Sequence, residues 1–474
     1  MRIDVGQFDF EPDDFLPLVA HRSPNVVMLL DGSYKATICV PGFGGHDLHG
    51  WDERNTRRRQ TNTLVQNIAD DNMTMTVHLV RHHSVPPFVE GPFRSEFAER
   101  LNRRYRASIA GQAMTTEWLV SLIVSPRFTP LKPLNRLKQR LGWRQRDIPA
   151  RAVEDSIQAL EDRVYILMSY LRQAGARRLG LRTDPDTGVQ YSEIAEAERL
   201  ILTGEWSPVP NVSGSLGAAV YNQRAVCGRR GIEIAAFGGP RFGMILGLKQ
   251  YMNQTRTGML DELLYANFPF VLSQAFHFKS RAAAATALWL REIRMENAME
   301  KAKSQIAGLV DAADDVTSGR EVRGDHHFSL AVYGDTFEEM LTRSGEAAKI
   351  IGNMGAVPAM EDRGSFAAYW SQLGGNPDWL RTRPGDIGSR NFSAFASFDG
   401  VPTGSRKGWW GEALIRFVTA HGTVYDFCLH IHDVGHTMVL GRTGRGKTAL
   451  LTFLATALEK AMAAGGTTVY FAST

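Results

Sequence analysis

Near its end the chain reads GHTMVLGRTGRGKTALLTFLATALEKA, residues 435–461. Residues 441–448 fit the pattern GxxxxGK[ST], whose glycines let the backbone curl until successive N–H groups point at phosphate oxygens. The apolar run HTMVLG before this loop is typical of a strand. The residues after the loop predict a helix with one apolar face, made of Leu450, Leu451, Leu454, Leu458 and Ala461. Strand, glycine loop and helix in this order predict a P-loop.

The loop residues have predicted roles in binding ATP. The helix that begins near Lys447 adds the positive end of its dipole to the site. We expect Lys447 to reach the β- and γ-phosphates, and the Thr448 hydroxyl to ligate Mg²⁺. The alternative is an exposed glycine-rich turn before an ordinary helix. The predicted nucleotide-binding residues are Gly441, Arg442, Thr443, Gly444, Arg445, Gly446, Lys447 and Thr448, with Thr448 also the metal ligand.

Hydrolysis of ATP requires more than this loop. A P-loop enzyme also uses a Walker B acid on a later strand, a group that positions water and often an arginine finger. The sequence after the helix has room for one more strand, at 469–471, and two strands cannot bury both faces of a parallel sheet. We therefore expect an incomplete nucleotide-binding domain in a truncated or partial chain. The predicted catalytic set is incomplete, and we expect no ATP hydrolysis by this chain alone.

The sequence before the P-loop predicts a mixed α/β protein. Apolar runs on both sides of Asp31-Gly32 predict a hairpin, and alternation predicts strands at 73–80 and 115–126. Helical spacing of apolar residues predicts a helix over 153–171. With 474 residues and 43% hydrophobic residues, the chain can build several cores.

The middle of the chain alternates between helix and strand signals. Residues 255–278 predict a helix that breaks at Pro269 and is followed by a strand, and 287–319 predict one long helix. With strands expected at 241–251 and 326–334 and a helix at 336–355, this order suits a small split βαβ layer. Loops are expected at 375–391 and 399–411, and a strand pair around His421-Gly422.

We expect three domains from these signals. An N-terminal α+β domain covers residues 1–150 and ends in a basic connector. A middle α/β domain covers 151–395, and the beginning of a RecA-like P-loop NTPase domain covers 396–474.

The connector at 127–151 carries eight Lys or Arg residues and one acid, Asp147. This composition suits an anionic membrane surface, a nucleic acid or an acidic partner, and equally a solvated linker. The N-terminus lacks a signal-peptide pattern, and no run of eighteen apolar residues predicts a membrane span. The three cysteines, Cys39, Cys227 and Cys428, are far apart, which predicts buried free thiols and no zinc site.

Histidine clusters offer weak metal candidates. The sequence HIHD at 430–433 and the pair His326-His327 could ligate a metal, but strand and turn positions explain them without one. The glycines of FGGPRFG, residues 237–243, lack the helix start of a phosphate site.

The P-loop stretch resembles that of the type IV secretion and conjugal-transfer ATPases, the CagE/TrbE/VirB group, whose form is close to GHTxxxGPTGSGKS. This chain has Arg442 where that form has proline and Arg445 where it has serine, and neither position supplies an essential side chain. Three upstream blocks are similar to blocks of the same family in the same order. They begin FGMILGLKQYMNQ at 242, HHFSLAVYGDTFEEM at 326 and NFSAFASFDGVPTGSRKGWWG at 391.

The resemblance implies an ATPase on the cytoplasmic face of a bacterial inner membrane, which energises pilus assembly and the transfer of DNA or protein. It implies ATP and Mg²⁺ as cofactors, inner-membrane secretion components as partners, and self-association of the complete protein. Two alternatives stay open at this stage. The chain could be a docking and assembly module without turnover, or an unrelated P-loop protein such as a DNA translocase or a transporter ATPase.

Overall fold

The computed structural model describes residues 15–44, 50–84, 93–127, 150–236, 239–297, 303–375, 381–409, 411–430 and 434–462. The chain forms two compact units, each built from separate segments. Unit 1 contains residues 1–82 and 117–400, and unit 2 contains residues 83–116 and 401–474. Each unit is described by itself below.

Unit 1 is built on a large sheet, which has thirteen strands in the described part of the chain. Its main path runs in the order β1-β2-β3-β5-β4-β12-β13-β11-β10-β9, and every strand pair with a determined register is antiparallel. The strands of this path are β1 (Leu18–Ser23), β2 (Val26–Leu29), β3 (Tyr34–Val40), β4 (Met73–His83), β5 (Met114–Val124), β9 (Ala225–Gly228), β10 (Gly231–Ala236), β11 (Gly239–Gln250), β12 (Phe270–Phe278) and β13 (Arg323–Gly334). Three short strands pair at its sides: β6 (Arg177–Arg178), β14 (Val357–Met360) and β15 (Gly385–Gly388).

The centre of this sheet joins segments that are far apart in the chain. Strand β4 pairs with β12 from Thr74 opposite His277 to Arg81 opposite Phe270. No boundary between compact units therefore falls at residue 150, because strands of the 1–150 segment pair with strands of the 151–395 segment in one sheet. The small split βαβ layer expected in the middle of the chain is wrong for the same reason. Its strands form one half of the large antiparallel sheet.

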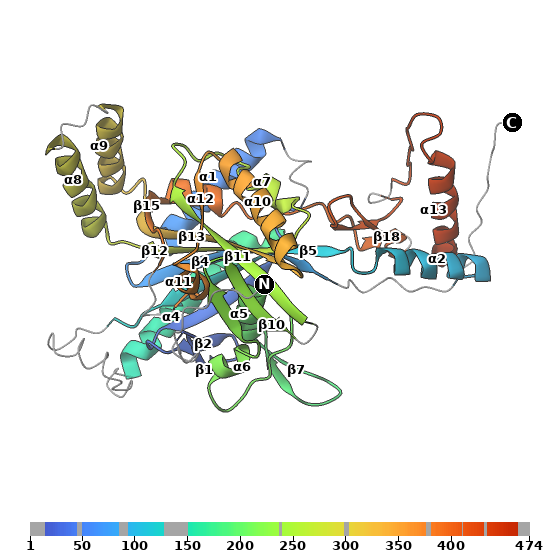
Figure 1. Ribbon diagram of the computed structural model, residues 1–474, viewed down its shortest axis with the longest axis horizontal. Coiled ribbons are helices and arrows are strands. Elements are labelled where there is room, and N and C mark those ends of the chain that lie inside the picture. The colour runs from blue at the N-terminus through green and yellow to red at the C-terminus, as the bar shows by residue number, and fades with distance from the viewer. Residues whose placement is uncertain are drawn as a thin grey trace. The chain divides into compact units, whose positions relative to one another are not determined.

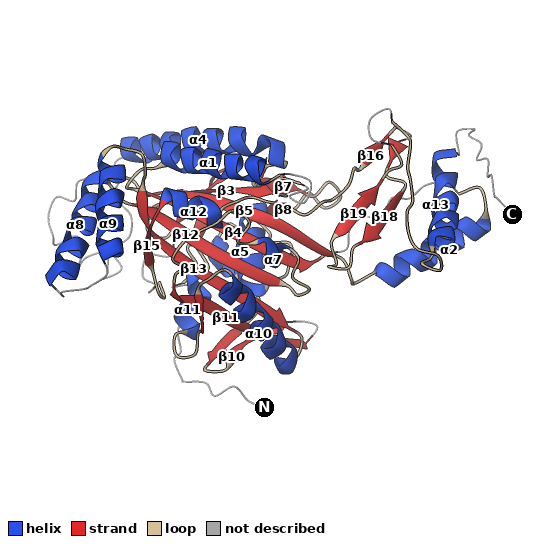
Figure 2. Ribbon diagram, turned by 90° about the horizontal axis from the view of Figure 1, so that it is seen from above, coloured by secondary structure: helices blue, strands red, loops and turns tan. Residues whose placement is uncertain are grey.

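Helices cover the sheet of unit 1. Helix α1 (Trp51–Ile68) lies beside α4 (Ala150–Leu171), as Figure 2 shows, and α4 packs on β3. Helix α10 (Phe337–Asn353) packs on β11 and β13. The other helical elements are α5 (Glu193–Thr203), α6 (Leu216–Val220), α7 (Asp261–Leu264), α8 (Arg281–Asn297), α9 (Lys303–Thr317), α11 (Ser365–Ser371), α12 (Ser389–Phe395) and the 3₁₀ turn at Arg172–Ala174. A separate pair, β7 (Leu181–Thr183) and β8 (Gln190–Ser192), forms a small hairpin.

Helix α5 is buried at nearly every position because it lies within the core of unit 1. Its apolar residues Ile194, Leu200 and Ile201 join the cluster formed by the neighbouring strands. Its charged residues are buried with partners, since Glu198 forms an ion pair with the fully buried Lys35. A buried charge is tolerated when it is paired in this way.

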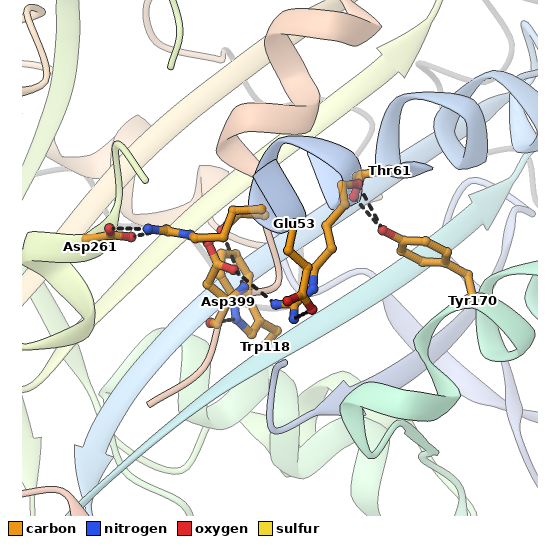
Figure 3. A network of polar contacts seen from close by, with 9 residues as sticks. Glu53, Thr61, Trp118, Tyr170, Asp261 and Asp399 are labelled. Atoms are coloured by element: carbon orange, nitrogen blue, oxygen red, sulfur yellow. Dashed lines mark hydrogen bonds and ion pairs between the residues drawn. The ribbon is translucent and has the colours of Figure 1, made fainter. Parts of the chain in front are cut away.

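A buried polar network fastens α1 to the rest of unit 1 (Figure 3). The guanidinium of Arg54 donates to both carboxylate oxygens of Asp261, at 2.9 and 2.7 Å, and to Asp399 at 3.0 Å. The indole N–H of Trp118 donates to the Asp399 carbonyl at 2.8 Å. Thr61 on the same helix bonds the Tyr170 hydroxyl on α4 at 2.8 Å.

Unit 2 combines the segment 83–116 with the C-terminal part of the chain. It contains α2 (Glu96–Ile109), the hairpin of β18 (Ile415–Val418) and β19 (Val424–Phe427), the short pair β16 (Lys407–Gly408) and β17 (Gly411–Glu412), and α13 (Lys447–Met462). Met114 forms a parallel bridge with Thr423, which joins the two segments. The segment 396–474 expected to be a domain therefore packs with 83–116, which no local pattern indicates.

Many predicted elements are confirmed. The hairpin at Asp31-Gly32 is β2 and β3, and the strand pair around His421-Gly422 is β18 and β19. The helices predicted at 153–171 and 336–355 are α4 and α10. The mixed α/β class is confirmed as well, with the strands mainly antiparallel.

Two predicted helices are wrong. The single helix expected over 287–319 is two helices, α8 and α9, which pack side by side (Figures 1 and 2) because Ala284 and Leu288 bury against Val316. The helix expected over 255–268 shrinks to the four residues of α7. Gly258 has φ of +76° there, and Asp261 is held by Arg54. Tertiary pairing thus overrides the local helical pattern.

The loop expected at 375–391 contains ordered structure: β15 pairs with β13, and α12 begins at Ser389 with its first residue fully buried. Cys39 is buried, whereas Cys227 and Cys428 are only partly buried, and all three are free thiols. Residues 128–149 of the basic connector and the strand expected at 469–471 lie outside the described residues.

Candidate functional site: the P-loop of unit 2

The predicted loop and the helix after it have the backbone that a phosphate site requires. Gly444 and Gly446 have φ of +78° and +79°, a region that side-chain-bearing residues rarely adopt. The Leu450 amide donates to the Gly446 carbonyl at 2.9 Å, and α13 runs from Lys447 to Met462. The first backbone N–H groups of a helix have no hydrogen-bond acceptor within that helix, so those of α13 can bind an anion.

Lys447 is folded over the loop. Its ammonium group donates to the carbonyl of Gly441 at 2.7 Å and to that of Arg442 at 3.0 Å. The ammonium is thus held by the first two residues of the loop. Thr448, one residue later, is exposed at the start of α13. All eight predicted site residues lie together in one loop and one first helical turn, and the fit to a nucleotide phosphate group is good.

The strand predicted before the loop is wrong for the described residues. Residues 435–440 form no ladder, and Met438 and Leu440 are 81% and 83% exposed. A strand forms only beside a partner strand, and none of the described residues offers one here. The apolar face predicted for the helix is partly confirmed: Leu454 is buried, whereas Leu450 and Leu451 are 37% and 48% exposed.

The C-terminal half of α13 is anchored within unit 2. Leu454 and Ala457 are buried in a cluster with Leu414 and Ile415 of the β18 region. Tyr105 of α2 joins this cluster and packs edge-on against Phe453, with ring centroids 4.9 Å apart. The P-loop itself is exposed, whereas the C-terminal half of α13 is held by packing on α2 and on the β18 region.

A second anchor joins α13 to the start of α2. The Glu459 carboxylate accepts hydrogen bonds from the backbone N–H groups of Arg94 and Ser95, at 3.1 and 3.0 Å, and from the Ser95 hydroxyl at 2.9 Å. Beside it, the Lys460 ammonium lies 5.3 Å from the centre of the Phe93 ring, and burial lowers the pKa of Lys460. Sequence reasoning missed these residues, because more than 330 positions separate the end of α2 from the P-loop and no motif links them.

The pair His326-His327 has protein partners in the core of unit 1. His326 and His327 lie in β13, fully buried, and bond the Gln274 side chain and the Thr382 carbonyl respectively. Burial lowers the pKa of His326 to about 3 and that of His327 to about 4. No group of three or more metal-ligating side chains occurs among the described residues, and 431–433 of the HIHD sequence lies outside them.

Comparison with known proteins bears on the whole chain. Residues 177–382 match the family model described as "CagE, TrbE, VirB family, component of type IV transporter system". Residues 25–130 match the one described as "Type IV secretion system ATPase VirB4/TrbE, N-terminal domain". The chain belongs to this family. An unrelated P-loop protein is thereby excluded.

Curated relatives match along nearly the full chain. Protein virB4 of Agrobacterium fabrum is 41% identical over 449 residues, which is 94% of this chain and 56% of the relative. Type IV secretion system protein virB4 of Bartonella henselae is 34% identical over 451 residues, and protein PtlC of Bordetella pertussis is 28% identical over 479. The chain therefore spans little more than half the length of these relatives. Among the described residues, no helix is both long and apolar enough to cross a bilayer.

Proposed function

We propose that this chain is the ATP-binding portion of a type IV secretion or conjugal-transfer ATPase. The observation that carries the proposal is the P-loop, which combines two glycines with positive φ, the Lys447 ammonium bonded back to the Gly441 carbonyl, and the N-terminus of α13. Family membership supports the same function, since the Agrobacterium and Bartonella relatives are named virB4.

The chain's own residues divide the work of binding. The loop amides around Gly444 and Gly446 donate to phosphate oxygens, and the Lys447 ammonium exchanges its carbonyl partners for the β- and γ-phosphates. The Thr448 hydroxyl is placed to hold Mg²⁺, which neutralises phosphate charge when it is bound. Among the described residues, no carboxylate forms a hydrogen bond or ion pair with Lys447 or Thr448. We propose that this chain binds Mg-ATP without turning it over.

Nucleotide affinity tests this assignment. We expect Lys447→Ala to weaken Mg-ATP binding tenfold to hundredfold, because a charged hydrogen-bond partner is worth about 1.5–3 kcal/mol. Arg445→Ala is the matched control, since it removes a positive charge from the same exposed loop at a position whose backbone, and not its side chain, is expected to bind phosphate. Isothermal titration calorimetry on the 474-residue chain measures both, with phosphate release followed in parallel. Equal affinities for the two variants would refute the phosphate site, and Lys447-dependent phosphate release would refute the absence of turnover.

We further propose that the protein works at the cytoplasmic face of the inner membrane, bound to secretion-system partners, with DNA or protein as the transferred substrate. The basic residues of 127–151 could each add about 1 kcal/mol near an anionic leaflet. Flotation of the full-length protein, with and without its secretion partners, tests this. Equal flotation in both cases after a high-salt wash would contradict docking through partners.

A second candidate is a docking and assembly module. It is favoured by the size of unit 1, which holds most of the chain and carries no nucleotide motif. If the Mg-ATP titration shows no binding by the intact chain, this second function replaces the first.

A further inference from the structure

A small polar cavity lies in unit 1, between the large sheet and residues 371–375 at the end of α11. Side chains of β4, β12 and β13 line it together with this segment and Arg381, and its volume is about 10 Å³. One water molecule needs a cavity of about 10–15 Å³. The cavity therefore has the size of a single water molecule and is far too small for a nucleotide or a metabolite.

Two hydroxyl groups in the lining of this cavity are buried without a protein partner. Among the described residues, none forms a hydrogen bond with Oγ1 of Thr76 or with Oγ of Ser273, although these residues are only 1% and 2% exposed. Burying a hydroxyl without a partner costs free energy, and native proteins satisfy most such groups through protein atoms or ordered water. The two hydroxyls therefore point to a small polar ligand.

The register of β4 and β12 sets the distance that this ligand must bridge. Thr76 lies opposite Ala275. Ser273, two residues away on the same strand, lies opposite His78. Thr76 and Ser273 are thus diagonal neighbours on one face of the sheet, and such neighbours are about 7–8 Å apart in the backbone. Short side chains at this separation are better joined by one bridging water than by a direct hydrogen bond.

The backbone of residues 371–375 comes very close to the sheet beside the cavity. A β-carbon at Gly374 would lie 2.4 Å from Cγ2 of Thr76, so the close approach requires glycine. The Nε2–H group of His78 donates to the Gln372 carbonyl at 2.9 Å and fastens the same segment. A molecule in the cavity would therefore lie between the sheet and a segment that is held against it.

We propose that this cavity binds one ordered water molecule, which bridges the hydroxyls of Thr76 and Ser273 and so joins β4 to β12 beneath residues 371–375. A bridging water satisfies both hydroxyls, since it can donate to one and accept from the other. A cation fits less well, because the Arg381 guanidinium lines the same cavity. Chloride has a suitable charge but is larger than water. The site lies in unit 1 and does not depend on the proposed nucleotide site.

A crystal structure of the 474-residue chain, at a resolution that shows ordered water, tests the site directly. We expect a density peak about 2.5–3.0 Å from both hydroxyl oxygens. A second crystal grown with bromide as the halide identifies the occupant, because bromide gives an anomalous signal and water does not. An anomalous peak in the cavity overturns the proposal in favour of an anion. A direct hydrogen bond between the two hydroxyls, without a peak, overturns it as well.

A double-mutant cycle tests the bridge in solution. Thr76→Val and Ser273→Ala each remove one partner of the same water, so the second change should matter less once the first has been made. We expect the unfolding constant of the double variant to differ about threefold or more from the product of the two single effects. Urea unfolding of the whole chain measures the four proteins of the cycle, and additive effects would overturn the bridge.

The matched control pairs Thr76→Val with Ser329→Ala. Ser329 lies opposite Ser273 on β13, is 1% exposed and has a hydroxyl without a partner among the described residues, but it does not line the cavity. Its effect should combine with that of Thr76→Val to within about a factor of two. Coupling of equal size in both cycles would overturn the proposal, because it would come from the sheet as a whole and not from a shared water.

Discussion

At the residue scale, the buried histidines of β4 and β13 carry neutral imidazoles into the core of unit 1. The Nε2–H group of His78 donates to the Gln372 carbonyl at 2.9 Å, and burial lowers the pKa of His78 to about 4, as burial lowers those of His326 and His327. Partners in the sheet thus satisfy these side chains, among them the pair His326-His327 that was weighed as a metal candidate.

These histidines predict a loss of stability in mild acid. Their pKa values are lower in the folded than in the unfolded chain, so the unfolded chain binds more protons below pH 6.5. Stability is therefore complete above pH 6.5 and falls as the pH decreases toward the folded pKa values near 3 to 4. At pH 5.5 each histidine costs about 1.4 kcal/mol. Urea unfolding at pH 7.5 and 5.5 measures the difference in unfolding free energy.

One histidine at a time can be removed to check this assignment. His78→Gln should reduce the difference between pH 7.5 and 5.5 by about 1.4 kcal/mol, whatever it does to stability at pH 7.5. The parent chain, measured at the same two pH values, is the control. An unaltered pH difference in His78→Gln would assign the acid sensitivity to other groups.

The carboxylates around Arg54 predict an order of mutational cost. Asp399 is 4% exposed and Asp261 is 28% exposed at the side chain, and both accept from the same guanidinium. Asp399→Asn should cost about 2–4 kcal/mol, because it weakens a buried pair, whereas Asp261→Asn should cost about 1 kcal/mol. Urea unfolding of the two variants at pH 7.5 measures the costs. Equal values would show that Asp399 is not the main partner of Arg54.

At the element scale, local patterns predicted the elements well wherever neighbours in sequence decide them. Strands such as β4 and helices such as α10 follow from alternation and helical spacing, and α10 has its N-cap at Thr336, whose hydroxyl accepts from the Glu339 amide. The failures occur where distant contacts decide. The split of 287–319 into α8 and α9 depends on packing between its two halves, and the shortening of α7 depends on Arg54.

The candidate site shows the same division. The P-loop residues 441–448 were predicted from a local motif, and the structure brings them together in one loop. The packing of α2 on the helix that follows the P-loop could not be predicted from a local motif. It depends on Tyr105 and on the contact between Ser95 and Glu459, which join segments far apart in the chain.

The contact between α2 and α13 predicts a specific effect of Ser95. Its hydroxyl accepts from the Ala98 amide as the N-cap of α2 and donates to Glu459. Ser95→Ala should destabilise the start of α2 by about 1–2 kcal/mol. Hydrogen exchange of the α2 amides measures this effect. Ser108→Ala, near the other end of the same helix and exposed, is the control, and equal protection in both variants would contradict the proposed anchor.

At the scale of the whole molecule, the two units interrupt each other along the chain. The segment 83–116 leaves unit 1 after His82 and returns at Glu117, and the side chains of these two residues lie 3.4 Å apart. Residues 401–474 then complete unit 2. This topology conflicts with a chain of three successive domains divided at 150 and 395, and the two arrangements predict different behaviour when the chain is cut.

Splitting the chain between Gly400 and Val401 distinguishes these arrangements. Co-expressed as separate polypeptides, residues 1–400 and 401–474 should co-purify, because α2 packs with α13 and Met114 bridges to Thr423 within unit 2. A tag on the first fragment and a pull-down under native conditions measure this, and urea should release the second fragment.

The control removes the part of the first fragment that belongs to unit 2. Replacing residues 83–116 by a short Gly/Ser linker should leave unit 1 folded, because the linker has only to join the neighbouring positions His82 and Glu117. This variant should fail to retain residues 401–474 while its circular dichroism and melting temperature stay close to those of the parent fragment. Retention by the linker variant would mean that 401–474 is held by unit 1. If the parent fragment 1–400 also failed to retain residues 401–474, the C-terminal segment would form a domain without 83–116.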